Sequence, residues 1–467
     1  MYKIDFNKPC RIHFIGIGGI SMSGFAKFLH SIDFQVSGSD SHQTNTTNNL
    51  SEMGIQVYYG QKPSNIGDDI DLIVYTAAIS EDNPEYQEGK KRNIPFLNRS
   101  ELIGQIMNNY NNSIAVAGTH GKTTTTSMLT QIFMEGKMDP TVFVGGMLDS
   151  IGGNMRIGDS EHFITEACEY TNSFLDFNPD KAIILNIDED HMDFFKNLDD
   201  IRNSFRLFAQ LLPEKGQLYI NGEIDNYNEI SDNLSCQVIS YGIIDPSHRV
   251  KDEIYDISAD NISFDDLQST SFDLYIRGKH MDRIVLRDIG IHNISNCLPA
   301  IGIGLESKIP LKAIKEALAN FSNSKRRLEF KGQVGGVSIV DDYAHHPTEI
   351  TATLSSAQIY NFNTVWCVFQ PHTYSRTKRH LKDFASSLAL ADKIVLADIF
   401  PAREKDPGDI SSKDLLRELE ALGKEVYYFP SFNQIENFLL ENCINGDLLI
   451  TMGAGDIVKV GEALLGQ

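Results

Sequence analysis

The stretch "AVAGTHGKTTTT", residues 115–126, begins with small apolar residues and ends in a run of threonines. It contains the glycine–lysine–hydroxyl order of a phosphate-binding loop, whose usual form is G-x-x-x-x-G-K-[ST]. The first glycine of that form would fall at Val116, and Gly118 comes two residues later. The stretch therefore predicts a shortened phosphate loop between a buried strand and a helix, as in an α/β protein with a parallel sheet.

This loop supplies the first candidate nucleotide-binding residues. The ammonium group of Lys122 can contact the β- and γ-phosphates, and the Thr123 hydroxyl can ligate Mg²⁺. The alternative is a purely structural run of small residues at a helix start. The expected phosphate-binding residues are Gly118, Thr119, His120, Gly121, Lys122, Thr123 and Thr124.

Two later strand ends can complete a metal site. The segment "HFITEACEY" puts Glu166 at the end of one strand with Glu169 nearby, and "IILNIDEDHMDFF" puts Asn186, Asp190 and His191 after another. Ligands gather beyond the carboxyl ends of strands in open α/β sheets, and Mg²⁺ prefers oxygen ligands, so Glu166 fits a metal role. For His191, spacing alone leaves a metal-binding and a structural role equally open.

The segment "RIHFIGIGGISMSGFAKFLH" near the N-terminus predicts a second strand–glycine–helix unit. Its glycines Gly16 and Gly18 resemble a dinucleotide fingerprint, with Ser21 at the third glycine position and Asp40 about 20 residues further on to accept from a ribose hydroxyl. A serine at that position is expected to need a permissive backbone angle. The alternative is a glycine turn that only packs helix on strand, and the loop alone does not distinguish NAD from another diphosphate.

Restarts of this strand–turn–helix pattern divide the 467 residues into three predicted domains, in line with about 150 residues per domain. Residues 1–108 predict a Rossmann-like parallel sheet. Residues 109–325 predict a P-loop ATPase-like α/β domain with added β structure, and residues 326–467 predict a second Rossmann-like domain.

Composition limits the classes of partner. The formal net charge of −22 argues against a broad nucleic-acid-binding face, which needs clustered cations. The six cysteines include no C-x-x-C pair, which predicts reduced thiols and a cytoplasmic location. Neither a secretory signal nor a membrane-spanning apolar segment is expected.

A family resemblance rests on four segments: "GTHGKTTTT", "TEACEY", "NIDEDHMDFF" and "HNISN". Together they resemble the Mur ligases and, more distantly, the folylpolyglutamate synthases. The resemblance covers essentially the whole chain, and it is narrowed by "GIGGISMSGFA", "DDYAHHPTE" and "FQPHTYSRT" to the branch that joins L-alanine to UDP-N-acetylmuramate. It implies that the shortened loop is this family's form of phosphate loop.

The resemblance also implies a reaction, with ATP and Mg²⁺ as cofactors. The lactyl carboxylate of UDP-N-acetylmuramate takes the γ-phosphate of ATP to give an acyl phosphate, and the amine of L-alanine then displaces phosphate. This is amide bond formation in cytoplasmic peptidoglycan precursor synthesis. The implied protein is a monomer or homodimer that uses small-molecule substrates and binds neither nucleic acid nor membrane.

Residue roles follow from the matched motifs. The resemblance implies six substrate contacts in the first domain: Gly16, Gly18, Gly19, Ser23, Asp40 and Ser80. It implies three Mg²⁺ ligands: Thr123, Glu166 and His191. Asn293 and Asn296 match residues near the adenine, although polar groups that simply begin a helix are the alternative.

The third domain carries the implied amino-acid side of the site. Arg327 matches an arginine that reaches the ATP phosphates; its alternative is a solvated charge run with Lys325 and Arg326. Asp341 or Asp342 matches the ATP-ribose contact, with Asp342 preferred. Residues that face the reacting centre or the amino acid are Tyr343, His345, His346, His372 and Arg376. The implied catalytic residues are Lys122, His191, Arg327, His345, His372 and Arg376.

Within that set, Arg376 can pair with the α-carboxylate of alanine, and one of the three histidines can take the proton from its amine. The motif placement further implies that the third domain closes during the reaction.

Three other functions remain open at this point. A nicotinamide-dependent oxidoreductase would account for the first loop and Asp40 but leaves Lys122 and Thr123 unexplained. A non-enzymatic nucleotide switch would use the phosphate loop alone. A sister ligase would attach a preformed peptide to the same sugar nucleotide. The absence of lysine from residues 197–214 agrees with the alanine-adding branch, since related ligases carry a carbamylated lysine there.

Overall fold

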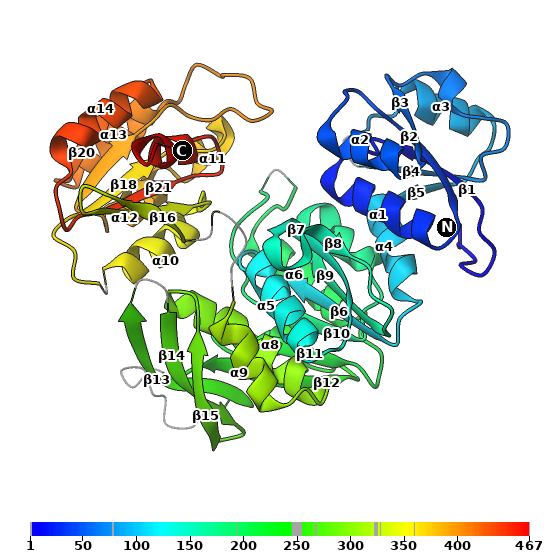
Figure 1. The fold of residues 1–467 in the computed structure, drawn as a ribbon, viewed down its shortest axis with the longest axis horizontal. Coiled ribbons are helices and arrows are strands. Elements are labelled where there is room, and N and C mark those ends of the chain that lie inside the picture. The colour runs from blue at the N-terminus through cyan, green and yellow to red at the C-terminus, as the bar shows by residue number, and fades with distance from the viewer. Residues whose placement is uncertain are drawn as a thin grey trace. The chain divides into compact units, whose positions relative to one another are not determined.

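The computed structural model describes residues 2–76, 79–192, 194–244, 255–266, 269–321, 326, 328–358 and 360–466. Within these residues the chain forms three β-sheets with accompanying helices (Figure 1), which confirms the three-domain α/β class. By contacts the chain divides into two compact units. Unit 1 comprises Met1–Ser258, Tyr275–His280 and Ser295–Ala317, and unit 2 comprises Ala259–Leu274, Met281–Ile294 and Leu318–Gln467. The domain boundaries after residues 108 and 325 stay predictions.

The first sheet lies in unit 1 and has the order β3-β2-β1-β4-β5, with every pair parallel. Its strands are β1 (Arg11–Ile15), β2 (Gln35–Asp40), β3 (Gln56–Tyr59), β4 (Leu72–Tyr75) and β5 (Phe96–Asn98). Its helices are α1 (Ile20–Ser31), α2 (Asn45–Glu52), α3 (Pro84–Lys91) and α4 (Arg99–Met107), with a 3₁₀ turn at Pro63–Asn65. The chain order reverses between β1 and β4, so the glycine loop after β1 lies at the switch point where such sheets bind ligands.

The second sheet has ten strands in the order β15-β14-β13-β12-β11-β10-β6-β9-β7-β8. Its strands are β6 (Asn112–Ala117), β7 (Thr141–Leu148), β8 (Gly153–Arg156), β9 (His162–Ala167), β10 (Lys181–Ile184), β11 (Gln217–Asn221), β12 (Gln237–Ile243), β13 (Ile257–Asp266), β14 (Ser269–Ile276) and β15 (Lys279–Leu286). The central strand β6 pairs in parallel with β9 and β10. This adjacency brings the segments that follow all three strands to one edge of the sheet.

Helices and short turns connect these strands. They are α5 (Lys122–Glu135), α6 (Leu198–Ala209), α7 (Asn228–Ser231), α8 (Ile291–Glu306) and α9 (Leu311–Ala319), with 3₁₀ turns at Asp149–Ile151 and Tyr170–Asp176. Within unit 1 the first and second sheets share apolar packing, because the ring of Phe25 in α1 lies 4.8 Å from the ring of Phe143 in β7, centroid to centroid. This shared core explains why two predicted domains form one compact unit.

The third sheet lies in unit 2 and has the order β16-β17-β21-β18-β19-β20. Its strands are β16 (Glu329–Val334), β17 (Val337–Asp342), β18 (Val365–Phe369), β19 (Lys393–Leu396), β20 (Glu425–Tyr428) and β21 (Leu448–Met452). Its helices are α10 (Pro347–Ala357), α11 (Tyr374–Arg379), α12 (Leu381–Leu388), α13 (Ser412–Ala421), α14 (Phe432–Asn442) and α15 (Val458–Leu464). Only β16 runs antiparallel to its neighbour among the paired strands described. β17 and β18 flank β21, so the segments after them meet at one edge.

Two further observations bear on the sequence predictions. The six cysteines all carry free thiols, as the spacing predicted. In the described part of the chain, every helix is too short or too polar to span a bilayer.

Candidate active site

The phosphate loop turns tightly between β6 and α5. Gly118 has φ 145° and Gly121, the N-terminal cap of α5, has φ 83°. These are angles that glycine adopts without strain. A Cβ on Gly118 would lie 2.8 Å from Cβ of Leu185, so the loop also passes too close to the end of β10 for a side chain. No side chain caps the start of α5, so the first amides of this helix face the concave side of the loop as anion donors.

Asn186 fixes the shape of this loop. Its side chain accepts a hydrogen bond from the His120 amide at 2.7 Å and donates to the His120 carbonyl at 3.0 Å. Its backbone carbonyl accepts from the Thr119 amide at 3.2 Å, and the Thr119 hydroxyl in turn accepts from the Asp188 amide at 2.9 Å. The sequence suggested Asn186 as a neighbour of the metal. In the structure it joins the loop to the segment after β10 by hydrogen bonds. The partners on the loop side are Thr119 and His120, two of the predicted phosphate-binding residues.

Lys122 is held by a buried carboxylate. Its ammonium group donates to the carbonyl oxygens of Gly118 and Thr119 and lies 3.1 Å from Oε2 of Glu169, which is 2% exposed. Burial by itself lowers the pKa of Lys122, but the charge and hydrogen bond of Glu169, together with the nearby Cys168 and Glu166, raise the pKa above its ordinary value. The lysine is therefore a fixed cation at the loop. Sequence reasoning missed the pairing with Glu169.

The predicted metal ligands are placed at the same edge of the sheet. Thr123 is the second residue of α5, and Glu166, near the end of β9, accepts the Gly145 amide at 2.6 Å. His191 lies with Nε2 4.0 Å from Oε1 of Glu169, and its ring packs against Tyr170 with a centroid separation of 4.5 Å. The same nitrogen lies 3.9 Å from Oδ2 of Asp190, so two carboxylates flank it.

The oxygen donors present suit Mg²⁺, which takes few protein ligands and keeps several waters. A hydroxyl at Thr123 and a carboxylate at Glu166 are donors of that kind. Among the described residues no group of three or more His, Cys, Asp or Glu side chains is arranged to enclose a metal ion. The residues therefore fit a metal that is shared with a bound phosphate, and do not form a protein-only metal cage.

Asn296 joins the phosphate loop, whereas Asn293 belongs to unit 2. Both lie on α8. The side chain of Asn296 fills the space beside Gly121 that a Cβ would need, and the backbone carbonyl of Asn296 accepts from the Thr125 hydroxyl at 3.3 Å. The side-chain amide of Asn293 donates to the Ile289 carbonyl at 2.8 Å, which places this bond at the start of α8.

The first glycine loop is closed by Asp40. Oδ2 of Asp40 accepts the Gly18 amide at 2.9 Å, and Gly16 has φ 85°, which a glycine tolerates. Gly19 caps α1 without a side-chain hydrogen bond, so the start of this helix is also a ready anion site. The expectation for Ser21 was wrong: it lies inside α1 and has no positive φ, because the helix begins one residue before it.

The other two predicted contacts in the first domain have internal partners. Ser23 is 4% exposed, and its hydroxyl donates to the Ile20 carbonyl at 2.9 Å. The Ser80 hydroxyl bonds to Asp82. Ala77 and Ala78, in the same turn as Ser80, lie outside the described residues.

A second cluster forms in unit 2 after β17 and β18. The ring of His345 lies 5.5 Å from the ring of Tyr343 and 5.6 Å from that of His372, measured between centroids. Burial, followed by the nearby His345 and Arg376, lowers the pKa of His372 to about 4. Its Nδ1 is buried with no hydrogen-bond partner among the described residues. His372 is therefore a neutral imidazole at physiological pH, while His346 caps α10 by accepting the Thr348 amide.

Arg326 pairs with Asp341, one of the two aspartates at the end of β17. Its Nε donates to Asp341 at 2.8 Å, and its other nitrogens donate to the carbonyls of Gly453 and Gly455. Burial raises the pKa of Asp341 despite this partner. Asp342 accepts the Leu328 and Ala344 amides at 2.9 and 2.7 Å, so its carboxylate is engaged within unit 2. Arg326 is thus bonded within unit 2 and is not part of a solvated run of charges. Arg327, the predicted ATP contact, lies outside the described residues.

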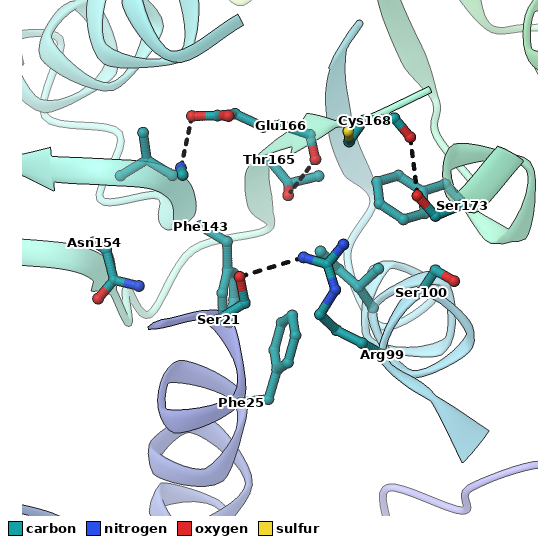
Figure 2. Close-up of a pocket in the computed structure, with 14 residues that line it drawn as sticks. Ser21, Phe25, Arg99, Ser100, Phe143, Asn154, Thr165, Glu166, Cys168 and Ser173 are labelled. Atoms are coloured by element: carbon teal, nitrogen blue, oxygen red, sulfur yellow. Dashed lines mark hydrogen bonds between the residues drawn. The ribbon is translucent and has the colours of Figure 1, made fainter. Parts of the chain in front are cut away.

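A cavity of about 90 Å³ lies in unit 1 beside the predicted metal ligand Glu166 (Figure 2). Its lining comes from α1, α4, β7, β8, β9 and the segments after β9, and includes Ser21, Arg99, Asn154, Thr165, Glu166 and Cys168. Nη1 of Arg99 donates to the Ser21 hydroxyl at 3.3 Å. Sequence reasoning missed Arg99. One signal was available: it is a cation in the first turn of a helix, where the helix dipole disfavours positive charge.

The chain is similar along its length to proteins of one family of ligases. Models of Mur ligase domains match residues 11–111 (Mur ligase family, catalytic domain), 116–304 (Mur ligase middle domain) and 326–455 (Mur ligase, glutamate ligase domain). The chain is 56% identical over 467 residues to the UDP-N-acetylmuramate–L-alanine ligase of Lachnoclostridium phytofermentans, with both chains fully covered. It is 48% identical to the ligase of that name from Clostridium botulinum strain Loch Maree, covering 98% and 99% of the two chains.

A solved structure is similar as well. The UDP-N-acetylmuramate–alanine ligase of Thermotoga maritima is 27% identical and superposes with a TM-score of 0.77 over 98% of each chain. Identity this high over the full length, together with the phosphate loop and three sheets, leads to one conclusion: the chain belongs to the Mur ligase family.

Proposed function

We propose that this chain is an ATP-dependent carbon–nitrogen ligase that joins L-alanine to the lactyl carboxylate of UDP-N-acetylmuramate, a step of peptidoglycan precursor synthesis. The observation that carries the proposal is the lysine-bearing phosphate loop in a chain 56% identical, end to end, to a ligase of that name. The nicotinamide and switch alternatives leave that similarity unexplained.

The chemistry sets what the residues must do. A carboxylate is a poor electrophile because it is anionic and resonance-stabilised, so the γ-phosphate of ATP converts it to an acyl phosphate with a good leaving group. The positive charge of Lys122 and the amides of the loop stabilise the charge on the phosphates. Mg²⁺ held by Thr123, Glu166 and a shared phosphate would offset the remaining negative charge.

The sugar nucleotide is assigned to the first sheet. The loop of Gly16, Gly18 and Gly19, at the start of α1, provides backbone donors for a diphosphate. Oδ2 of Asp40 accepts the Gly18 amide, and the carboxylate of Asp40 is the proposed acceptor for a ribose hydroxyl of the nucleotide.

The amino acid is assigned to the cluster in unit 2. Arg376 can pair with the carboxylate of alanine through two parallel hydrogen bonds. His372 is neutral because its pKa is lowered to about 4, so it can lie beside the amine without repelling a positive charge, but the same low pKa makes it a weak base. Nδ1 of His346 already accepts the Thr348 amide and caps α10, so this nitrogen is not available to take the proton.

The test is phosphate release from ATP with UDP-N-acetylmuramate as acid and either L-alanine or a preformed tripeptide as amine. Release that depends on L-alanine supports the proposal. Release with the tripeptide alone supports the sister ligase, and release that neither amine changes supports a nucleotide switch.

A further inference from the structure

The cavity beside Glu166 contains a cation that the roles assigned so far do not use. Arg99 is the one basic residue among the described residues that line it. Its side chain extends from α4 toward Ser21 and the segment of Thr165 and Cys168 (Figure 2). In the described part of the chain, its guanidinium donates to the Ser21 hydroxyl at 3.3 Å and forms no ion pair.

The position of this arginine is electrostatically unfavourable without an anion. Arg99 is the first residue of α4, where the positive end of the helix dipole repels a cation. The helix is already capped by Asn98 and Glu101 through a reciprocal pair of hydrogen bonds, so Arg99 is not needed to satisfy its amides. A guanidinium without a carboxylate partner, in a protein of net charge −22, indicates a binding site for an external anion.

The size and location of the cavity limit the anion. At about 90 Å³ it has room for a carboxylate or phosphoryl group with a few waters. One wall, at Ser21, directly follows the first glycine loop. The opposite wall is Glu166, whose charge acts on Lys122 at the phosphate loop. A group that enters this cavity is therefore between the predicted diphosphate site and the predicted ATP phosphates.

We propose that Arg99 binds the carboxylate of the acid substrate and retains it as the acyl phosphate forms. This inference rests on the proposed function, which supplies both the carboxylate and the phosphoryl donor. The guanidinium offers paired N–H donors that match either oxyanion, and Ser21 keeps it oriented toward the cavity. Arg99 would also offset the repulsion between the bound anion and the Glu166 carboxylate. Arg99 would thus recognise the carboxylate, the group that distinguishes an acid-bearing sugar nucleotide from one without the acid.

The test compares two ligands that differ in this feature. UDP-N-acetylmuramate carries the lactyl carboxylate, and UDP-N-acetylglucosamine has a hydroxyl in its place. Calorimetry with the full chain should show that Arg99→Met weakens binding of UDP-N-acetylmuramate by about tenfold to a hundredfold, the range for a lost charge-assisted hydrogen bond. Binding of UDP-N-acetylglucosamine should change by less than about twofold, because that ligand makes no contact with the guanidinium.

Two matched variants complete the experiment. Arg99→Lys keeps the charge but loses the paired geometry, and its ratio of the two affinities should lie between those of the wild type and Arg99→Met. Arg92→Ala removes an exposed arginine at the C-terminal end of α3 that pairs with Glu88 and Asp68, and it should leave both affinities unchanged.

The ratio of the two affinities decides the outcome. If Arg99 is only structural, Arg99→Met should weaken the binding of both sugar nucleotides equally and leave the ratio of the two affinities unchanged. That result would overturn the inference. A wild type that binds the two ligands equally also overturns it, without any variant. The proposed function is tested separately, by alanine-dependent phosphate release from the wild type. If that release occurs and the affinity ratio does not respond to Arg99, the inference fails while the function stands.

Discussion

Nζ of Lys122 lies 3.1 Å from Oε2 of Glu169, and this carboxylate is buried at 2% exposure. The pair links the start of α5 to the segment after β9, two elements more than 40 residues apart in sequence that the parallel pairing of β6 and β9 brings together. Because Glu169 holds the ammonium charged before any phosphate arrives, the loop is electrostatically prepared for a triphosphate.

Replacement of the lysine should abolish catalysis and weaken the fold. We expect Lys122→Met to reduce alanine-dependent phosphate release by at least about a hundredfold, the scale seen when a transition-state charge donor is removed. It should also leave Glu169 buried and unpaired, at a cost of about 3 kcal/mol in the free energy of unfolding. UDP-N-acetylmuramate binding, measured by calorimetry, should be unaffected. The double variant Lys122→Met/Glu169→Gln should recover stability but not activity; substantial turnover in either variant contradicts the assignment.

Glu169 should control the pH dependence of stability through Lys122. The pKa of Lys122 is raised above its ordinary 10.5, so the stabilisation is fully present below pH 10.5 and is lost as pH rises through the higher folded value. Glu169→Gln removes the first of the groups that raise this pKa and leaves the lowering effect of burial in place. The difference in unfolding free energy between wild type and Glu169→Gln should therefore be largest near neutral pH and shrink above about pH 10.5. A difference that stays constant from pH 7 to pH 12 in urea titrations would rule out this coupling.

His372 should remain neutral in acid solution. Burial and the neighbouring His345 and Arg376 lower its pKa from 6.5 to about 4. The folded protein therefore resists protonation there, and the associated stability, present above pH 6.5, is lost as pH falls toward 4. Imidazole NMR should show His372 titrating near pH 4 in the wild type and at higher pH in Arg376→Ala. Arg379→Ala, on the same helix, is the control and should leave the titration unmoved. A wild-type midpoint near 6.5 would contradict the account.

Asn186 should hold the phosphate loop in its binding shape. Asn186→Ala removes the two side-chain bonds to His120. Each of these partly buried hydrogen bonds contributes about 1 kcal/mol, so we expect ATP affinity to fall about tenfold and the free energy of unfolding to fall by about 1–2 kcal/mol. Asn197→Ala, which removes the cap of α6, should cost about 1 kcal/mol of stability without a change in ATP affinity. Equal ATP affinity in the two variants would show that the loop does not depend on Asn186.

The sequence predicted candidate site residues where a glycine loop or a polar segment comes directly after a strand. The phosphate loop after β6, the glycine loop after β1 and the polar segments after β9, β10 and β17 were all predicted, because the carboxyl ends of parallel strands are where ligands bind. The three sheets follow from the same restarts of strand and helix.

The contacts between distant segments could not be read in this way. The pairing of Lys122 with Glu169 depends on which strands are neighbours, and the contact between Arg99 and Ser21 depends on how α1 and α4 lie in unit 1. Arg326 looked like part of a solvated basic run, and only the fold shows that it bonds Asp341 and two glycine carbonyls. Sequence periodicity also separated the first two domains, whereas apolar packing such as Phe25 on Phe143 joins them.

The most direct test of the central claim is phosphate release from ATP by the purified chain with UDP-N-acetylmuramate, Mg²⁺ and a choice of amine. The account predicts release that requires L-alanine, forms UDP-N-acetylmuramoyl-L-alanine in equal amount, and disappears in Lys122→Met. Release that is indifferent to L-alanine, or that needs a preformed peptide in its place, would contradict it.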